Sequence, residues 1–259
     1  MKTKRYLIIG SLALITGLAQ AASVDEIIQQ ANQASYYAGK DGMADVTMEI
    51  HDSKGGKRVR EFRILRLNSG GATQKFYVYF QAPADVRKMA YLVWKNGEKE
   101  DDRWLWLPAL NLVKRIAPGD KRTSFVGSDF VYEDVSGRSP DADVHELLET
   151  TDTQFVIKNT PKNAGEVEFA AYTVWIDKTT YLPAKAEYTD AQGKLYRRVS
   201  ATKVETIDGI PTVTESMVED LVTGGKTINR FTNVTYNNDL NDRIFSERFL
   251  RRPPSEATR

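Results

Sequence analysis

The sequence contains no cysteine and only two histidines, His51 and His145, among its 259 residues. Without a thiol the chain can form no disulfide, no cysteine nucleophile and no lipid-modified cysteine anchor. The histidines form neither an H-x-x-x-H nor an H-x-H pattern, and no G-x-S-x-G turn or glycine-rich phosphate loop is present. These absences argue against an enzyme, so we expect no metal site and no cofactor. A hydrolase of lipid esters remains a less favoured alternative.

The sequence also lacks a charge excess, with 36 basic against 35 acidic residues, which gives no electrostatic reason to expect a nucleic-acid partner. It has one long apolar run, Tyr6 to Leu18, which is short for a membrane span. Lys2, Lys4 and Arg5 precede this run, and Ala19-Gln20-Ala21 follows it with the spacing that signal peptidase requires. Residues 1–21 are therefore predicted to be a cleaved signal peptide, with an uncleaved anchor as the alternative. Cleavage would change the formal net charge from +1 to about −2.

Export through such a signal places the protein in the periplasm of a Gram-negative bacterium, and an extracellular location is the weaker option. The remaining residues, 22–259, contain no linker-like segment and no fixed repeat, so they are expected to form a single domain that does not span a membrane. Ser23 and Glu26 have the spacing of a capping box, which predicts a helix from there to about Tyr37. The apolar positions of this helix recur at helical spacing and should pack on a sheet.

After this helix the apolar residues follow a period of two, which is typical of strands with one buried face. Short loops rich in Gly, Asp and Asn separate these segments and favour antiparallel hairpins. We expect short helices at 127–132, 144–148 and 241–249. The predicted fold is mainly β (α+β), with about eleven antiparallel strands in an unclosed barrel and a few helices on its concave apolar side.

The densest group of motifs lies between residues 103 and 134. It comprises Trp104-Leu-Trp-Leu-Pro108, Lys114-Arg115-Ile116 and Ser124-Phe-Val-Gly-Ser-Asp-Phe-Val-Tyr-Glu-Asp134. With Leu182-Pro183 and Asp208-Gly-Ile-Pro211, these motifs make the chain resemble the LolA-like outer-membrane lipoprotein-sorting proteins. The resemblance is to the longer relatives associated with RND-type (MMPL-like) exporters and covers most of residues 22–259.

The resemblance implies an open barrel of the LolA/LppX type, with an apolar cavity under its helices that carries lipid or acyl chains through the periplasm. An apolar ligand needs a concave, largely apolar pocket with few polar groups. The strand alternation offers a set of buried apolar residues for its wall, although the same residues could equally fill a solid core. These candidates are Val46, Met48, Ile50, Phe62, Ile64, Phe76, Val78 and Phe80.

Trp104 and Trp106 share one strand face and are further candidates for the cavity wall, with a packed aromatic cluster as the alternative. Lys114, Arg115 and Asp129 could form a polar rim that meets a lipid headgroup. For the basic pair, a solvated surface position is the default interpretation. The acidic residues of the 124–134 loop are more readily explained as helix caps and ion-pair partners of nearby basic residues than as a metal or acid–base site.

The hypothesis we favour is a periplasmic carrier that binds lipid or lipoprotein acyl chains and passes them between membranes, with an inner-membrane RND/MMPL-type exporter as its partner. The first alternative is a module of the same fold that senses lipoproteins or envelope stress and binds a protein regulator. The second is the lipid hydrolase mentioned above.

Overall fold

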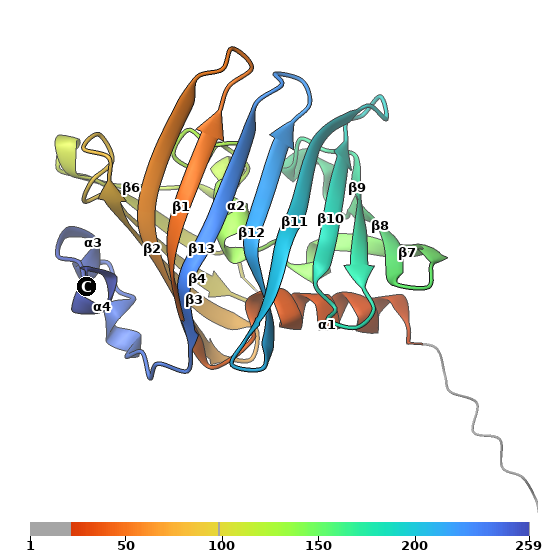
Figure 1. Ribbon diagram of the computed structural model, residues 1–259, viewed down its shortest axis with the longest axis horizontal. Coiled ribbons are helices and arrows are strands. Elements are labelled where there is room, and N and C mark those ends of the chain that lie inside the picture. The colour runs from red at the N-terminus through yellow and green to blue at the C-terminus, as the bar shows by residue number, and fades with distance from the viewer. Residues whose placement is uncertain (1–21, 98, 259) are drawn as a thin grey trace, which may run out of the picture.

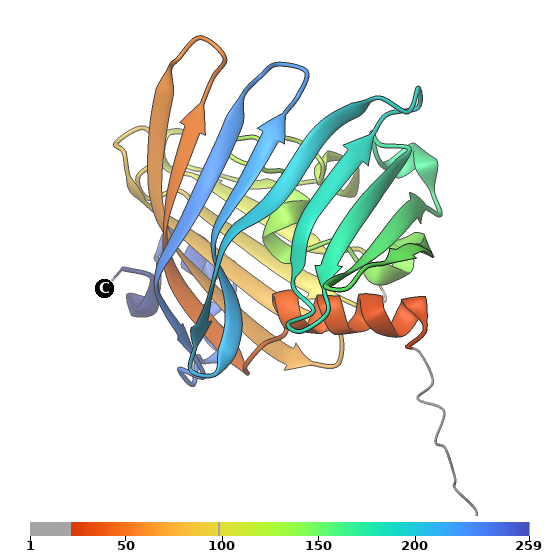
Figure 2. The ribbon, with the colours of Figure 1, turned by 45° about the vertical axis from the view of Figure 1, so that its right-hand side comes forward.

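The computed structural model describes residues 22–97 and 99–258, so the predicted signal peptide lies outside the described residues. Thirteen antiparallel strands form one sheet in the order β6-β5-β4-β3-β2-β1-β13-β12-β11-β10-β9-β8-β7 (Figure 1). The chain starts in the middle of the sheet at β1, runs outward to β6, crosses to the opposite edge and returns from β7 to β13. The sheet curls into a barrel (Figure 2). Because β6 and β7 stand at the two ends of the strand order and do not pair with each other, the barrel is unclosed, as predicted.

The strands are β1 (Asp41–His51), β2 (Lys57–Gly70), β3 (Thr73–Ala82), β4 (Ala90–Asn96), β5 (Asp102–Leu107), β6 (Leu112–Arg115), β7 (Asp143–Thr150), β8 (Gln154–Pro161), β9 (Ala171–Asp177), β10 (Pro183–Thr189), β11 (Leu195–Ile207), β12 (Ile210–Asp220) and β13 (Lys226–Tyr236). The α-helices are α1 (Val24–Tyr36), α2 (Tyr132–Ser136), α3 (Arg248–Arg251) and α4 (Ser255–Thr258). Short 3-10 turns add η1 (Pro108–Leu110), η2 (Pro118–Asp120), η3 (Pro140–Ala142), η4 (Ala164–Glu166) and η5 (Asp242–Ile244).

Strand alternation decides which residues face the concave side. Val46 of β1 lies opposite Phe62 of β2 and Phe231 of β13, and Phe62 lies opposite Phe80 of β3. These side chains belong to the core cluster on the concave side of the sheet. The intervening residues of β3 and β4 face the convex side, where Tyr77 belongs to a second cluster. The β3 segment is thus buried on both faces, as its apolar and aromatic run predicts.

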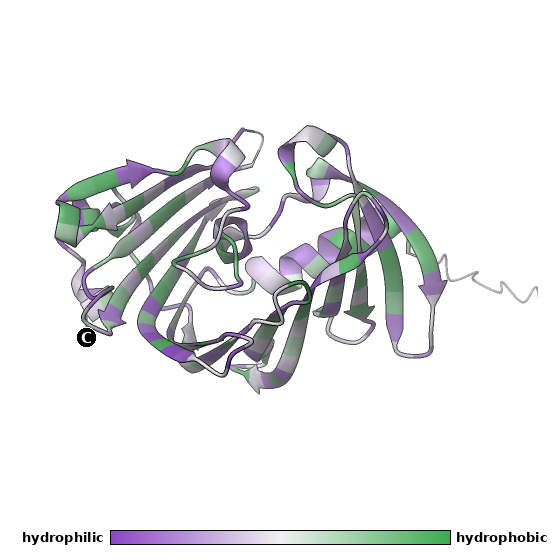
Figure 3. Ribbon diagram, turned by 90° about the horizontal axis from the view of Figure 1, so that it is seen from above, coloured by the Kyte–Doolittle hydropathy of each residue, from purple (hydrophilic) through white to green (hydrophobic). Residues whose placement is uncertain are grey.

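Helix α1 lies in the concavity of the sheet, as seen from above (Figure 3). Its capping box is present: the Ser23 hydroxyl accepts from the Glu26 amide, and the Glu26 carboxylate accepts from the Ser23 amide at 2.7 Å. Ile27 and Ala31 pack against Ile157 of β8 and against β9. The sequence therefore sets both the start of α1 and the face that it buries.

Residues 116–142 cross from β6 to β7 on the concave side and carry α2. Phe125 and Tyr132 from this crossing segment pack against Tyr91 of β4, with ring centroids 5.4 and 5.2 Å apart. The Asp134 carboxylate accepts from the Val131 amide at 2.7 Å and so caps α2. A segment that joins the two free edges of a curled sheet must span its mouth, which explains why this part of the chain is short of regular structure.

The C-terminal helices α3 and α4 cover the convex face of the sheet over β2 to β5. Leu250 and Ala257 pack in the second cluster, with Leu65, Tyr77 and Trp104. The Tyr77 hydroxyl donates to the Phe249 carbonyl at 2.7 Å, and the Trp94 indole N–H donates to the Phe245 carbonyl, also at 2.7 Å. The convex side of β2 to β5 is therefore a core in its own right.

Three local expectations are corrected by the structure. Residues 144–148 belong to β7, because pairing with β8 overrides a sequence that also suits a helix. This is one reason the sheet has thirteen strands and not about eleven. Residues 127–131 form a loop and α2 begins only at Tyr132, while 241–249 contains only η5 and the beginning of α3. None of the helices within residues 22–97 and 99–258 combines the length and the apolar character that a membrane span requires.

Candidate functional site

A cavity of about 500 Å³ lies between α1 and the concave face of the sheet. Its walls come from α1, from inward residues of β1 to β3 and β7 to β13, and from the crossing segment. Every second side chain of a strand faces inward, and the strands around the cavity accordingly alternate apolar and polar residues (Figure 3). A volume of this size falls within the range of protein pockets that hold small apolar ligands.

Five of the eight strand residues expected in the cavity wall line it: Met48, Phe62, Ile64, Phe76 and Val78. The other three, Val46, Ile50 and Phe80, are buried in the same core cluster but do not belong to the lining. The concave face is thus packed in one part and hollow in another. Further lining comes from small or half-buried residues that sequence reasoning did not single out, among them Ala34, Ala186, Val199, Ala201 and Val213.

The structure contradicts the placement of Trp104 and Trp106 in the cavity wall. Both indoles are buried on the convex face: Trp104 packs edge-on against Trp94 at 4.8 Å, and the Arg251 guanidinium lies 4.8 Å from the Trp106 ring. It is Leu105 between them that joins the concave core. The pattern established that the two tryptophans share a face, but it could not say which face, because apolar cores cover both sides of this strand.

The expected polar rim is also displaced. Lys114 and Arg115 are exposed on the edge strand β6, and Arg115 pairs with Asp102 of β5. The Asp129 carboxylate accepts from the Thr227 hydroxyl at 2.6 Å and holds the crossing segment to β13. None of the three belongs to the residues that line the cavity.

Four charged residues of the cavity lining, Arg122, Glu133, Asp134 and Arg138, come from the crossing segment. The Arg122 guanidinium lies 3.3 Å from the Glu133 carboxylate and 2.7 Å from that of Glu168. Arg138 lies 3.5 Å from Glu133 and pairs with Asp143 at 2.8 Å, and Asp134 pairs with Arg197 of β11 at 2.5 Å. We call these residues the ionic network: Arg122, Glu133, Asp134, Arg138, Asp143, Glu168 and Arg197.

Three arginines face four carboxylates in the ionic network, so each arginine has an acidic partner and one negative charge is in excess. Burial disfavours the charged form of Arg138, but the hydrogen bond to Asp143 and the nearby Glu133 outweigh it and raise the pKa of the guanidinium. Burial, and after it the Asp143 charge, raises the pKa of the Tyr172 hydroxyl well above its usual value. The nearby carboxylates of Asp143 and Glu133 therefore favour the charged form of Arg138.

Sequence reasoning anticipated part of this arrangement, because it expected the acidic residues of the 124–134 loop to serve as caps and ion-pair partners. Asp134 caps α2 and Glu133 pairs with Arg122. Arg197 and Glu168, however, join the network from distant positions that no local pattern marks. Within the described ranges, no group of three or more His, Cys, Asp or Glu side chains is placed to hold a metal ion.

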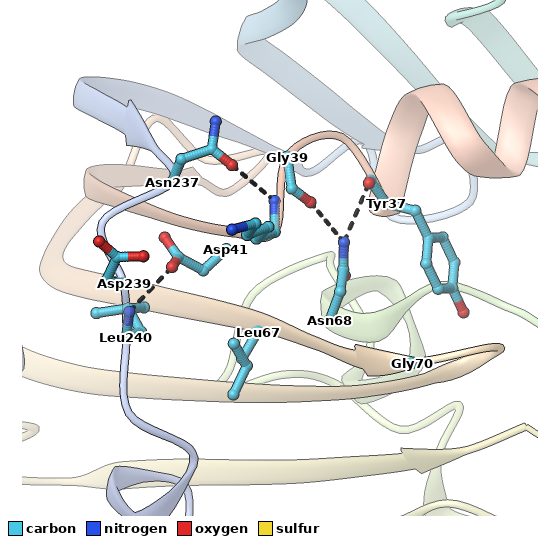
Figure 4. A pocket seen from close by; sticks show the side chains of 10 residues that line it. Tyr37, Gly39, Asp41, Leu67, Asn68, Gly70, Asn237, Asp239 and Leu240 are labelled. Carbon is cyan, nitrogen blue, oxygen red and sulfur yellow. Dashed lines mark hydrogen bonds between the residues drawn. The ribbon is translucent and has the colours of Figure 1, made fainter.

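A second depression lies where the C-terminal segment leaves β13 (Figure 4). It is a shallow cleft of about 760 Å³. The Asp41 carboxylate accepts from the Leu240 amide at 3.0 Å, and the Asn68 side chain donates to the Tyr37 and Gly39 carbonyls at 3.0 and 2.6 Å. These polar groups anchor the protein's own chain, so we assign the cleft a structural role and treat the cavity under α1 as the candidate site.

Comparisons with known proteins agree with this fold. A family model with the description "Uncharacterized protein" matches residues 72–252, and no curated protein matches the sequence. A DUF1329 family protein from Desulfovibrio piger is 30% identical, with 87% of this chain and 97% of that chain covered and a TM-score of 0.80. A domain from Vibrio parahaemolyticus, described as an outer membrane lipoprotein-sorting protein, is 27% identical, with 88% and 98% coverage and a TM-score of 0.81.

A LolA superfamily protein from Nitrosomonas europaea is 19% identical and shares the fold, with 88% of this chain and 100% of that chain covered and a TM-score of 0.68. The family model covers more than half of the chain, and the Desulfovibrio protein is matched over nearly its full length. The chain therefore belongs to the DUF1329 family, and it shares the fold of the lipoprotein-sorting domain and of the LolA superfamily protein.

Proposed function

We propose that the protein is a periplasmic carrier that binds lipid or lipoprotein acyl chains in the cavity under α1 and passes them between membranes. The observation that carries this proposal is the cavity of about 500 Å³ whose wall contains Met48, Phe62, Ile64, Phe76 and Val78. The charged lining residues from the crossing segment belong to the ionic network and are already paired. What remains for a ligand is mostly hydrocarbon surface.

The physical gain from such a ligand is substantial. Burying one methylene of an acyl chain is worth about 0.8 kcal/mol, so a chain of a dozen methylenes gains on the order of 10 kcal/mol before the cost of association is subtracted. A carrier needs this gain because a free acyl chain in the periplasm would be exposed to water. As the partner in this transfer we propose an inner-membrane RND/MMPL-type exporter.

The proposal includes cleavage of residues 1–21, so that residues 22–259 form a single mature domain. The Vibrio domain's description as an outer membrane lipoprotein-sorting protein supports the same location and cargo class. For this chain, we now propose as lipid-contacting residues the five strand residues named above, together with the α1 residue Ala34 and the β11 residues Val199 and Ala201.

The test is native mass spectrometry of the full chain expressed with its own leader and purified from the periplasm. We expect co-purifying lipid on the wild-type protein and its loss in Ala34→Trp, because the indole would occupy the space beside α1. Gln30→Trp is the matched control, since Gln30 is exposed on the same helix and lies outside the cavity lining. A wild-type protein that stays empty, and that also fails to take up added acyl lipid, would refute the carrier proposal.

A pull-down from the same preparation separates the carrier from the sensing module. Recovery of a protein regulator by a wild-type protein that holds no lipid would favour the sensing module. Recovery of an inner-membrane exporter together with bound lipid would support the carrier.

A further inference from the structure

Asn229 of β13 is a polar residue in the apolar part of the cavity wall. Its side chain points to the concave side, the residue is 7% exposed, and it belongs to the cavity lining. Its neighbours across the sheet are Met48 of β1 and Ser216 of β12, both of which also line the cavity. The next inward residue along the strand is Phe231. An amide group is thus set beside Met48, Ser216 and Phe231 in the cavity wall.

The amide oxygen of Asn229 has no hydrogen-bond partner within residues 22–97 and 99–258. Nine buried side-chain atoms share this property there, and Asn229 Oδ1 is the one that belongs to a cavity-lining residue. A buried acceptor without a partner costs about 1 to 3 kcal/mol, and a ligand that donates a hydrogen bond to it would recover this cost.

Arg66, Arg138 and His145 of the same lining, in contrast, already have hydrogen-bond or ion-pair partners within the protein. The Arg66 guanidinium donates to the carbonyls of Tyr36 and Ala38, and Arg138 is paired with Asp143. Both ring nitrogens of His145 lie within hydrogen-bond distance of protein oxygens, at 2.7 and 3.0 Å. An anionic headgroup would therefore have to break an existing contact to find a cation.

We propose that Asn229 is a specificity-determining contact that selects cargo bearing a neutral hydrogen-bond donor, a hydroxyl or an amide N–H, along an apolar body. The inference rests on the proposed lipid-carrier function and narrows its substrate class. Ser216, one strand away on the same face, offers a second neutral partner for such a group. A ligand without a donor would displace water from the Asn229 oxygen on entry and would form no hydrogen bond in its place. Polar sites discriminate most strongly against ligands that leave a buried polar group unpaired in this way.

The test compares four ligands that share one hydrocarbon chain. Oleyl alcohol and oleamide carry the two kinds of neutral donor, methyl oleate carries no donor, and oleate carries a negative charge. Each is titrated against the purified full chain loaded with a fluorescent fatty-acid probe. We expect the alcohol, the amide or both to displace the probe at about five- to tenfold lower concentration than the ester and the anion. Comparison of the alcohol with the amide then shows whether the site prefers a hydroxyl or an amide N–H as the donor.

Asn229→Leu should remove this preference while leaving binding of methyl oleate equal or improved, because leucine has a similar size and needs no partner. Thr47→Val is the control, since Thr47 lies beside Met48 on the strand but outside the cavity lining. If the leucine variant unfolds, Asn229→Ala is measured in its place, and the wild-type ligand series is decisive without any variant. Equal affinities for the four ligands, or tightest binding of oleate, would overturn the inference while leaving the carrier proposal intact. No binding of any ligand would overturn both.

Discussion

Asp143→Asn tests whether the ionic network holds the crossing segment to the far half of the sheet. Asp143 is the first residue of the edge strand β7, and its side chain is fully buried. Its carboxylate accepts from Arg138 Nε and Nη2 at 2.9 and 2.8 Å, and from the Tyr172 hydroxyl at 2.9 Å. An asparagine keeps the shape, but it removes the charge and turns one acceptor into a donor that faces other donors.

The expected cost follows from the burial of the partner. Breaking a buried ion pair by removing one member costs about 3 to 5 kcal/mol, because the remaining charge is left uncompensated. Arg138 keeps Glu133 at 3.5 Å as a second carboxylate, so we expect the lower end, about 3 kcal/mol. For a domain of this size that corresponds to a fall in Tm of roughly 6 to 12 °C.

Urea unfolding followed by tryptophan fluorescence measures the effect, and a double-mutant cycle isolates the pair. Asp143→Asn and Arg138→Met are compared with the protein that carries both changes. We expect the double variant to be about 1 to 2 kcal/mol more stable than the sum of the single effects implies, since it leaves no unpaired charge. Additive effects would refute the reasoning, because they would mean that the pair makes no coupled contribution to stability.

Trp106→Ala should cost about 3 to 5 kcal/mol of stability and leave lipid retention in native mass spectrometry unchanged, because the indole packs on the convex face. Loss of lipid without loss of stability would contradict that placement. Hydrogen bonds from Lys57, Arg230 and His51 lower the pKa of Glu49 to about 2, with Lys57 contributing most. Since the pKa is lower in the folded state, its stabilising effect is complete above the ordinary value of 4.5 and is lost as the pH falls toward 2. Glu49→Gln should therefore flatten the acid limb of urea stability between about pH 5 and pH 2, and a limb as steep as in the wild type would contradict this.

Most of the architecture is predictable because local rules and tertiary packing agree in this chain. The Ser23 cap, the strand alternation and the Gly- and Asp-rich hairpins each specify one element, and the short connections leave an antiparallel sheet as the simple solution. The wrong secondary-structure predictions fall where the local helix preference of a segment and its packing in the sheet disagree. The segment around His145 suits a helix on its own, but it is held as an edge strand by pairing with β8.

The candidate site is less predictable because it depends on faces and long-range contacts. Alternation shows that Trp104 and Trp106 share a face, but both faces of β5 are buried, so burial alone cannot separate cavity from outer core. The pairing of Asp134 with Arg197 joins residues 63 positions apart. No spacing rule connects them, because their proximity results from the return of the chain across the whole sheet.

The coexistence of a solid core and a cavity on one concave face has a physical origin in side-chain size. Toward β3 and β4 the crossing segment inserts aromatic rings, and Phe125 lies 5.9 Å from Phe80 and 5.4 Å from Tyr91, which fills the space. Toward β10 and β11 the inward residues include the small Ala186 and Ala201, which belong to the cavity lining together with residues of α1. Close packing is the rule in protein interiors, so a wall of small residues under a separate helix is the arrangement that leaves volume for another molecule. The large apolar residues of the early strands and the small inward residues of the later strands line the cavity together, and it is the small ones that strand alternation did not mark as cavity residues.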